Sequence, residues 1–210
     1  MLRVNLTTQL RTKLRSNKEQ TKRQNMKHAI RQLSQAPSIA EYQPCAVDTF
    51  ISPAGILQLN ANAYGLSHLT VVGSDRTEIA LAKASEDALN QAKAHIRETQ
   101  AQLADYFAGE RVEFDLKLAP KGTEFQRDVW QALLNLDYGQ SCSYGQIAEQ
   151  IGRPKAVRAV GAANGANPIA IIVPCHRVIG KNGKLTGYAY GLAMKQQLLT
   201  LETDKHCLDI

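Results

Sequence analysis

The sequence has few cysteines, no long hydrophobic run and no secretory signal, and each absence excludes a class of protein. The four cysteines (Cys45, Cys142, Cys175 and Cys207) lack the spacing of a disulfide framework, which is typical of a reducing cytosol. No stretch of about 18 apolar residues occurs, so no transmembrane helix and no membrane partner are expected. The N-terminus has no compact apolar segment followed by a cleavage site. We therefore expect a cytoplasmic protein.

Most of the chain also lacks an excess of positive charge, although the net charge is +6. Residues 1–40 contain nine Lys or Arg against one acid, Glu19, whereas the rest of the chain has 16 of the 25 basic residues and 18 of the 19 acidic ones. A basic arm of this kind can attract DNA phosphates. A solvated extension has the same composition, and the sequence leaves both interpretations open.

Residues 45–119 have the pattern of a small α/β domain. Aliphatic and β-branched residues predict strands over residues 51–59 and 66–72, joined as a hairpin by a turn through residues 60–65. A helix is expected over about residues 85–108. Its buried face is indicated by apolar residues at helical spacing, namely Leu89, Ala92, Ile96, Leu103 and Phe107.

The second half has the pattern of a helix-turn-helix that follows a linker, residues 110–122. The segments 123–126 and 143–146 each place Gln three residues after Ser or Thr, a capping box that opens a helix. A further helix is expected to begin at Pro154 and end near Asn164, with an inner face of Ala156, Ala159, Val160 and Ala163. Two short helices around a glycine turn are typical of DNA-binding folds, but the same pattern occurs in helical pairs that bind nothing.

The expected outer face of that last helix combines one arginine with small residues: Arg158, Gly161, Ala162, Gly165 and Ala166. Helices that read bases in the major groove usually offer several Arg, Asn or Gln side chains. A face of small residues can instead approach the narrow minor groove, where a single arginine could enter the base stack. Small residues also serve close helix packing, so this face alone does not decide between the two interpretations.

An apolar run, residues 169–173, leads to Cys175 and His176. We expect it to place the cysteine in a buried or half-buried pocket. Cysteine attacks as a thiolate, which a neighbouring histidine favours, and a carboxylate can orient that histidine. Successive side chains of an extended strand point in opposite directions, so His176 would need a turn or a bridging water to act on Cys175. Taken alone, the pair is more often structural than catalytic, and no second pair has zinc-like spacing.

Eight segments follow one another in the second half: Thr123-Glu124-Phe125-Gln126, Val129-Trp130, Ser143-Tyr144-Gly145, Arg158-Ala159-Val160-Gly161, Asn167-Pro168, Pro174-Cys175-His176-Arg177-Val178, Gly187-Tyr188-Ala189, and Lys195 to Glu202. In this order they resemble the active-site domain of the O6-alkylguanine-DNA alkyltransferases, also called methylated-DNA–protein-cysteine methyltransferases. Residues 48–119 resemble the family's more variable N-terminal domain. The resemblance implies an α/β fold of two subdomains, an RNase H-like α/β domain (residues 45–119) and a winged helix-turn-helix-like active-site domain (residues 120–203). Residues 1–44 would be a basic, flexible extension.

The resemblance also implies roles for single residues in catalysis. Cys175 would accept the alkyl group, and His176 would act as its base through a water molecule. Glu202 would orient His176, and Tyr144 would donate a hydrogen bond to the guanine ring.

Further roles implied by the resemblance concern DNA and the substrate pocket. Arg158 would take the place of a flipped nucleotide, beside Ala162 and Gly165 on the same DNA-binding face. Asn167 would hold that helix to the active-site turn. The pocket would be formed by Val178, Tyr188, Ala189 and Tyr190.

The implied function is DNA repair by direct reversal. One alkyl group would move from O6-alkylguanine in duplex DNA to Cys175 after the base is flipped out, and each molecule would act once; O4-alkylthymine is a second substrate that the sequence leaves open. The protein would be a monomer without cofactor or metal. Asn62 and Ser67 stand where zinc-binding relatives have ligands, although Cys45 and His68 argue in the other direction.

Three other functions compete with this hypothesis. A lesion-binding protein without chemistry would lack the cysteine, and Cys175 is present. A regulator that senses alkylation would need an additional DNA-binding domain, for which residues 1–44 are too short. A thiol hydrolase would need an oxyanion site and would turn over.

Overall fold

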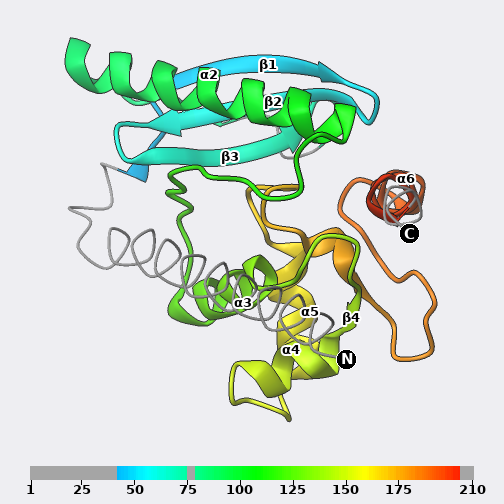
Figure 1. The fold of residues 1–210 in the computed structure, drawn as a ribbon. Helices are drawn as coiled ribbons and strands as arrows, with labels where there is room; N and C mark the ends of the chain where they lie inside the picture. The colour runs from blue at the N-terminus through cyan, green and yellow to red at the C-terminus, as the bar shows by residue number, and fades with distance from the viewer. Residues whose placement is uncertain (1–41, 75–78, 204–210) are drawn as a thin grey trace, which may run out of the picture. The chain divides into compact units, whose positions relative to one another are not determined.

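The computed structural model describes residues 42–74 and 79–203, which lie within one compact unit, Ile39–Ile210. The predictions for residues 1–41 and for Cys207 concern residues outside this part of the chain. The described residues form a mixed α/β structure (Figure 1). None of the described helices is both long and apolar enough to cross a membrane.

The first half forms an antiparallel sheet in the order β1-β2-β3, composed of β1 (Ala46–Ser52), β2 (Gly55–Asn62) and β3 (Gly65–Val71). The predicted hairpin is confirmed as β2–β3. The predicted strand over residues 51–59 is wrong, because it runs across a turn between two strands and leaves out most of β1.

That turn lies at Pro53 and Ala54. Ser52 Oγ donates to the carbonyl oxygen of Gly55 (2.7 Å) and accepts from the amide of Ala54 (3.2 Å). Gly55 has a φ of 113°, which glycine adopts without steric cost. Proline and glycine together mark a turn, and this signal within a run of apolar residues corrects the single predicted strand.

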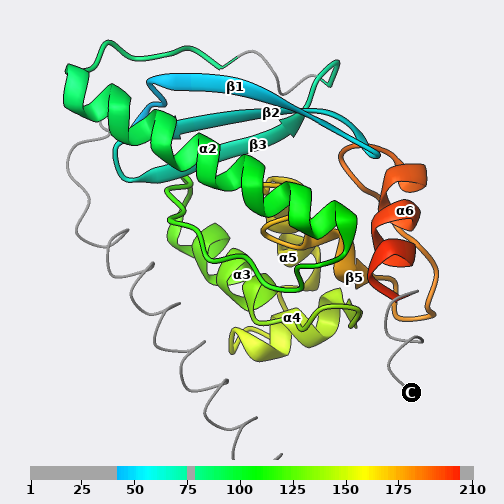
Figure 2. The ribbon, with the colours of Figure 1, turned by 45° about the horizontal axis from the view of Figure 1, so that its top comes forward.

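Helix α2 (Glu86–Ala108) lies across one face of the sheet (Figures 1 and 2). The predicted helix is confirmed. Ser85 Oγ accepts from the amide of Ala88 (3.3 Å) at its start, and Gly109 ends it with a φ of 71°. The predicted inner face packs on the sheet, and the ring of Phe107 stacks on that of Phe50. The helix thus brings its last turn, with Tyr106, to the second half of the chain.

The outer edge of β3 connects the two halves. The backbone of Leu66 pairs with residues 117–119, since its amide donates to the oxygen of Lys117 (2.9 Å). The amide of Leu69 donates to the oxygen of Pro168 (2.9 Å), and the amide of Ala170 donates to the oxygen of Leu69 (3.1 Å). The end of the predicted linker is therefore bound to the sheet, and the same edge supports the segment that leads to Cys175.

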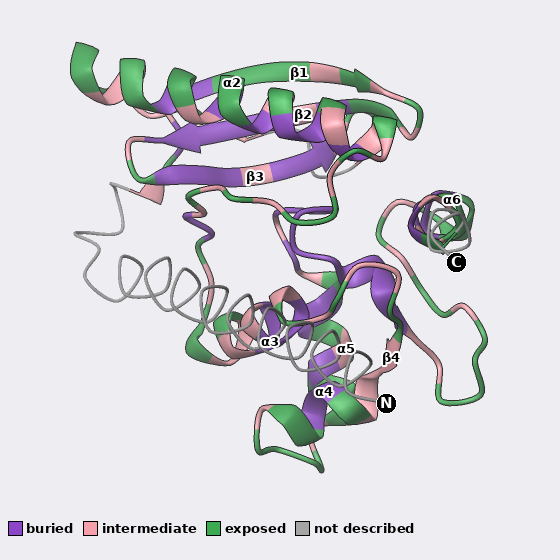
Figure 3. Ribbon diagram, viewed as in Figure 1, coloured by how far each residue is buried: buried purple, intermediate pink, exposed green. Residues whose placement is uncertain are grey.

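The second half consists of short helices and one small parallel pair of strands: α3 (Glu124–Leu134), β4 (Cys142–Ser143), α4 (Tyr144–Gln150), α5 (Val157–Gly165), β5 (Val178–Ile179) and α6 (Leu192–Thr203). Both predicted capping boxes are confirmed, at the starts of α3 and α4. Helices α3, α4 and α5 pack against one another. Figure 3 shows the buried core of this half, which includes all of residues 169–178.

Two expectations for α5 are wrong. The helix begins at Val157, three residues after Pro154, because residues 154–155 form a turn in which the amide of Ala156 donates to the oxygen of Arg153 (2.9 Å). Ala159 is exposed, and the buried residues of the helix are Val160, Ala163 and Asn164. The real inner face therefore lies around Val160 and Ala163, rather than extending to Ala159.

Candidate active site

Cys175 begins a short 3-10 helix, Cys175–Arg177, that follows a turn. The segment is not the extended strand considered from the sequence; it provides the change of direction that His176 would need. The side chain of Asn167 holds the turn, since its Oδ1 accepts from the amide of Ile169 (3.0 Å) and its Nδ2 donates to the oxygen of Val173 (2.8 Å). Nδ2 also lies 3.1 Å from Cys175 Sγ.

The thiol of Cys175 is almost completely buried, with 5% of the residue exposed. It lines a small pocket whose other walls come from the end of α5 and from the loop before α6: Asn164, Gly165, Asn167, Gly187, Tyr188, Ala189 and Tyr190. The rings of Tyr188 and Tyr190 meet edge to face at 5.6 Å. Burial, and then the neighbouring sulfur of Cys175, raise the pKa of Tyr188, so its hydroxyl keeps its proton.

His176 is completely buried, and its Nε2 lies 2.9 Å from Oε1 of Glu202. Burial lowers the pKa of His176 despite the adjacent carboxylate, so the neutral imidazole is favoured near pH 7. With Nε2 donating to a carboxylate, Nδ1 of the neutral ring is an acceptor. Nδ1 is buried and has no hydrogen-bond partner among the described residues. This atom can therefore take up a proton.

The carboxylate of Glu202 is the centre of the buried polar network. Arg177 donates from Nε to Oε2 (2.7 Å) and from Nη2 to Oε1 (2.9 Å). Tyr106 donates its hydroxyl to Oε1 (2.9 Å), and the amide of Gly139 donates to Oε2 (3.3 Å). Burial alone would raise the pKa of Glu202, but the hydrogen bonds from His176 and Arg177 hold it well below its usual value. The carboxylate is therefore charged, and both of its oxygens accept hydrogen bonds.

No role was predicted from the sequence for three side chains that surround Cys175 and Glu202. Arg177 and Tyr106 bind Glu202, and Lys195 is fully buried with its ammonium group donating to the oxygens of Thr186 (2.9 Å) and Val178. Burial lowers the pKa of Lys195, whereas attraction to Cys175 acts in the opposite direction. The available signal was spacing, because Lys195 shares one face of α6 with Leu198 and Glu202.

The other predicted site residues lie on three elements. Tyr144 begins α4, its ring lies near Gly161, and its hydroxyl accepts from Oγ1 of Thr186 (3.2 Å). Val178 lies on β5, and Arg158, Ala162 and Gly165 are exposed on α5. Five of the predicted site residues line the pocket of Cys175, namely Gly165, Asn167, Tyr188, Ala189 and Tyr190. Four others do not line it: Tyr144, Arg158, Ala162 and Val178. Their roles stay predictions.

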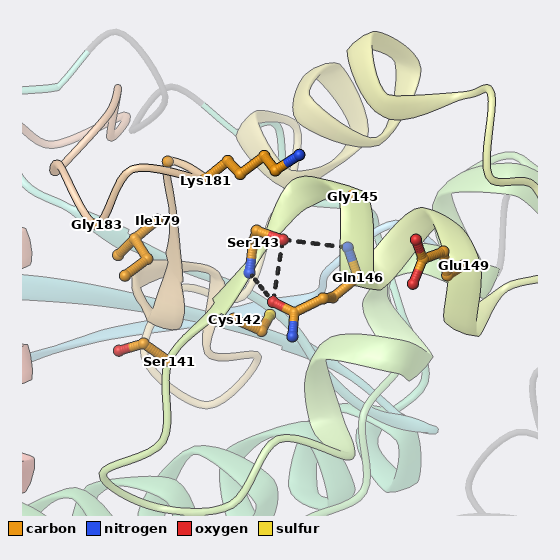
Figure 4. Close-up of a pocket in the computed structure, with 10 residues that line it drawn as sticks. Ser141, Cys142, Ser143, Gly145, Gln146, Glu149, Ile179, Lys181 and Gly183 are labelled. Carbon is orange, nitrogen blue, oxygen red and sulfur yellow. Dashed lines mark hydrogen bonds between the residues drawn. The ribbon is translucent and has the colours of Figure 1, made fainter.

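A second pocket lies over β4, β5 and the start of α4 (Figure 4). Figure 4 shows the hydrogen-bonded capping box of Ser143 and Gln146 near the centre of the view, with Lys181 above it and Glu149 to its right. It contains the thiol of Cys142, and burial raises the pKa of that thiol to about 11. A thiol that keeps its proton near pH 7 is a poor nucleophile.

The side chains at the two positions considered for zinc, Asn62 and Ser67, form hydrogen bonds with backbone groups of the protein. Asn62 donates to the oxygen of Tyr42 (3.2 Å) and accepts from the amide of Tyr64 (2.9 Å), and Ser67 donates to the oxygen of Asn60 (2.9 Å). No three His, Cys, Asp or Glu side chains of the described residues come together as metal ligands would. That the protein binds no zinc stays a prediction.

Known proteins with similar sequences decide the family. A family model for the DNA-binding domain of 6-O-methylguanine DNA methyltransferase matches residues 124–204. A methylated-DNA–protein-cysteine methyltransferase of Methanosarcina acetivorans is 52% identical over 154 residues, which cover 73% of this chain and 95% of that protein. This chain belongs to the methylated-DNA–protein-cysteine methyltransferase family.

Other methyltransferases of this family support the assignment. The Mycolicibacterium paratuberculosis protein is 66% identical over 101 residues, which cover 48% of this chain and 61% of that one. The crystal structure of Mycobacterium tuberculosis OGT in complex with DNA has a TM-score of 0.65 and 47% identity, covering 75% of this chain and 92% of that one. The family resemblance found in residues 123–202 is thereby confirmed.

Proposed function

We propose that this methyltransferase repairs DNA by moving an alkyl group from O6 of guanine to Sγ of Cys175. The observation that carries the proposal is the site of Cys175, a buried thiol in a pocket, followed directly by a histidine that favours its neutral form and whose Nδ1 has no hydrogen-bond partner among residues 42–74 and 79–203. Membership in the methyltransferase family supports the same chemistry.

The reaction needs no cofactor. Sγ loses its proton to Nδ1 of His176 through a water molecule, and Lys195 and the Asn167 amide stabilise the thiolate. The thiolate attacks the alkyl carbon, so an S–C bond forms while the C–O6 bond breaks. Tyr144 donates a hydrogen bond to the guanine ring, which lets the base leave without a full negative charge. The thioether is stable, so each molecule acts once.

Duplex DNA is the proposed partner, bound by a monomer. A guanine inside the helix cannot reach a buried thiol, so the base must be flipped into the pocket. The exposed small residues of α5, including Ala162 and Gly165, allow close approach to the minor groove, and Arg158 fills the space that the base leaves. Alkylated guanine pairs poorly, which lowers the cost of flipping it.

Residues 120–203 would act as a winged helix-turn-helix-like DNA-binding and active-site domain, with α4 and α5 as the helix pair. Residues 45–119 would be an RNase H-like domain that supports it through β3 and α2. The basic residues 1–44 would be an N-terminal extension.

The test of this function is the intact mass of the protein after incubation with a duplex oligonucleotide that contains one O6-methylguanine. We expect a gain of one methyl group, mapped by peptide analysis to the fragment with Cys175, and a yield that never exceeds one methyl per molecule. An unchanged mass, or a methyl group on another residue, would refute the proposal.

Tyr190 is expected to select against bulky adducts, because its ring lines the pocket beside Tyr188. A benzyl group would have to displace this ring, and such overpacking typically costs about 1–3 kcal/mol. We therefore expect benzyl transfer to be about tenfold or more slower than methyl transfer. Replacing Tyr190→Gly should raise the benzyl rate relative to the methyl rate. Tyr64→Gly, the same change in the β2–β3 turn, is the control, and equal methyl and benzyl rates in the unaltered protein would contradict the prediction.

A further inference from the structure

Tyr106 belongs to the first half of the chain but contacts the carboxylate of the active site. It lies near the end of α2 with 1% of its surface exposed. Its ring is held between those of Phe107 (5.2 Å), Phe114 (5.4 Å) and Tyr138 (6.2 Å). Its hydroxyl donates to Oε1 of Glu202 at 2.9 Å. Neighbouring rings therefore determine the direction from which this donor reaches the carboxylate.

The oxygen that Tyr106 contacts is the one that faces His176. Oε1 of Glu202 accepts from His176 Nε2, from the Tyr106 hydroxyl and from Arg177 Nη2, each at 2.9 Å. Burial and the adjacent carboxylate raise the pKa of Tyr106 far above its usual value, so the hydroxyl keeps its proton. Because the Tyr106 hydroxyl donates to the same oxygen as His176, it reduces the negative charge that Oε1 offers to the hydrogen bond from the imidazole.

We propose that Tyr106 is a positioning residue for alkyl transfer, whose hydroxyl fixes Oε1 of Glu202 and limits the negative charge that this oxygen presents to His176. The inference rests on the proposed function, because it concerns the base of that reaction. It gives the first half of the chain a part in the chemistry: α2 supplies one of the hydrogen bonds that orient and tune the base.

The direction of the effect follows from the charges around His176. Glu202 on α6 favours the imidazolium, and Arg177 on the 3-10 helix and Lys195 on α6 oppose it. Tyr138, in the loop after α3, also lies close to the carboxylate. If only the hydroxyl of Tyr106 is removed, Oε1 keeps more negative charge and the imidazolium gains stability. His176 would then lose its proton at higher pH, while the opposing cations stay in place.

The experiment is the single-turnover rate of methyl transfer from O6-methylguanine duplex DNA between pH 5 and pH 9. For Tyr106→Phe we expect the acid-side midpoint to move upward by about half a unit to one unit, a part of what one hydrogen bond to a charged group is worth. Below the midpoint the rate should fall about threefold to tenfold, and above it the rate should approach that of the unaltered protein, with one methyl still accepted per molecule. Tyr138→Phe is the matched control, since it removes a nearby hydroxyl that donates to the backbone oxygen of Leu201 (3.2 Å), and its midpoint should match the unaltered protein.

A companion variant keeps the test decisive if Tyr106→Phe folds poorly. Placing 3-fluorotyrosine at position 106 preserves the ring and makes the hydroxyl a stronger donor, so the midpoint should move to lower pH. The inference is overturned if both variants keep the midpoint of the unaltered protein, including the case in which the rate falls equally at every pH. If the unaltered protein itself transfers no methyl group, the proposed function fails, which is a separate result.

Discussion

Replacing Cys175 with alanine is expected to abolish alkyl transfer while leaving the affinity for duplex DNA nearly unchanged. The variant lacks the only atom that the proposed reaction uses as nucleophile, and neither His176 nor a water can form the thioether. The face of α5 proposed to bind DNA, with Arg158 and Ala162, is exposed and does not include the thiol. Transfer should be undetectable by intact mass, and binding should be measured by fluorescence anisotropy with the same O6-methylguanine duplex.

Cys142→Ala is the matched control for this experiment. Cys142 is a second cysteine in this half of the chain and is partly buried, and burial raises its pKa to about 11. It should keep its thiol protonated and take no part, so the Cys142→Ala protein should accept one methyl group at the rate of the unaltered protein. Methylation of the Cys175→Ala protein would show that another residue is the acceptor.

Local signals of the sequence were sufficient to place the starts of α3 and α4 and the end of α2. The capping boxes at residues 123–126 and 143–146 lie where α3 and α4 begin, and Gly109 ends α2. Such signals are reliable because the hydrogen bonds concerned are made within four residues. The α5 start was misplaced because Pro154 is compatible with a helical first turn and with the turn it actually forms.

Long-range contacts could not be predicted in the same way. The hydrogen bond from Tyr106 to Glu202 joins residues 96 positions apart. The other donor from a distant residue is the backbone amide of Gly139, which no pattern of side chains in the sequence reveals. The pairing of β3 with residues 117–119 and 168–170 depends on an open sheet edge, which any extended segment can use. The family resemblance predicts which residues take part in the chemistry, and the fold explains how the first half of the chain contributes to their arrangement.

Glu202→Gln should cause the largest loss of stability of any single conservative change at the site. The amide group would turn a donor toward Arg177, His176 or Tyr106, all of which are donors, and would leave the buried Arg177 without its counter-ion. Breaking a buried ion pair on one side typically costs about 3–5 kcal/mol. We expect a loss of that size in the free energy of unfolding at pH 7, measured by urea denaturation. Transfer should slow by about 10²–10⁴-fold, because His176 loses the charged acceptor that orients its ring.

The pH dependence separates the charge of Glu202 from a packing defect. Because its pKa is depressed in the folded state, Glu202 contributes stability that is present above its unfolded pKa of about 4.3 and is lost as the pH falls further. The unfolding free energies of the unaltered protein and of Glu202→Gln should therefore approach each other below about pH 5. Glu98→Gln, an exposed change on α2, should stay within about 0.5 kcal/mol of the unaltered protein throughout. A constant difference between Glu202→Gln and the unaltered protein from pH 7 to pH 3 would mean that shape, and not the buried charge, stabilises this network.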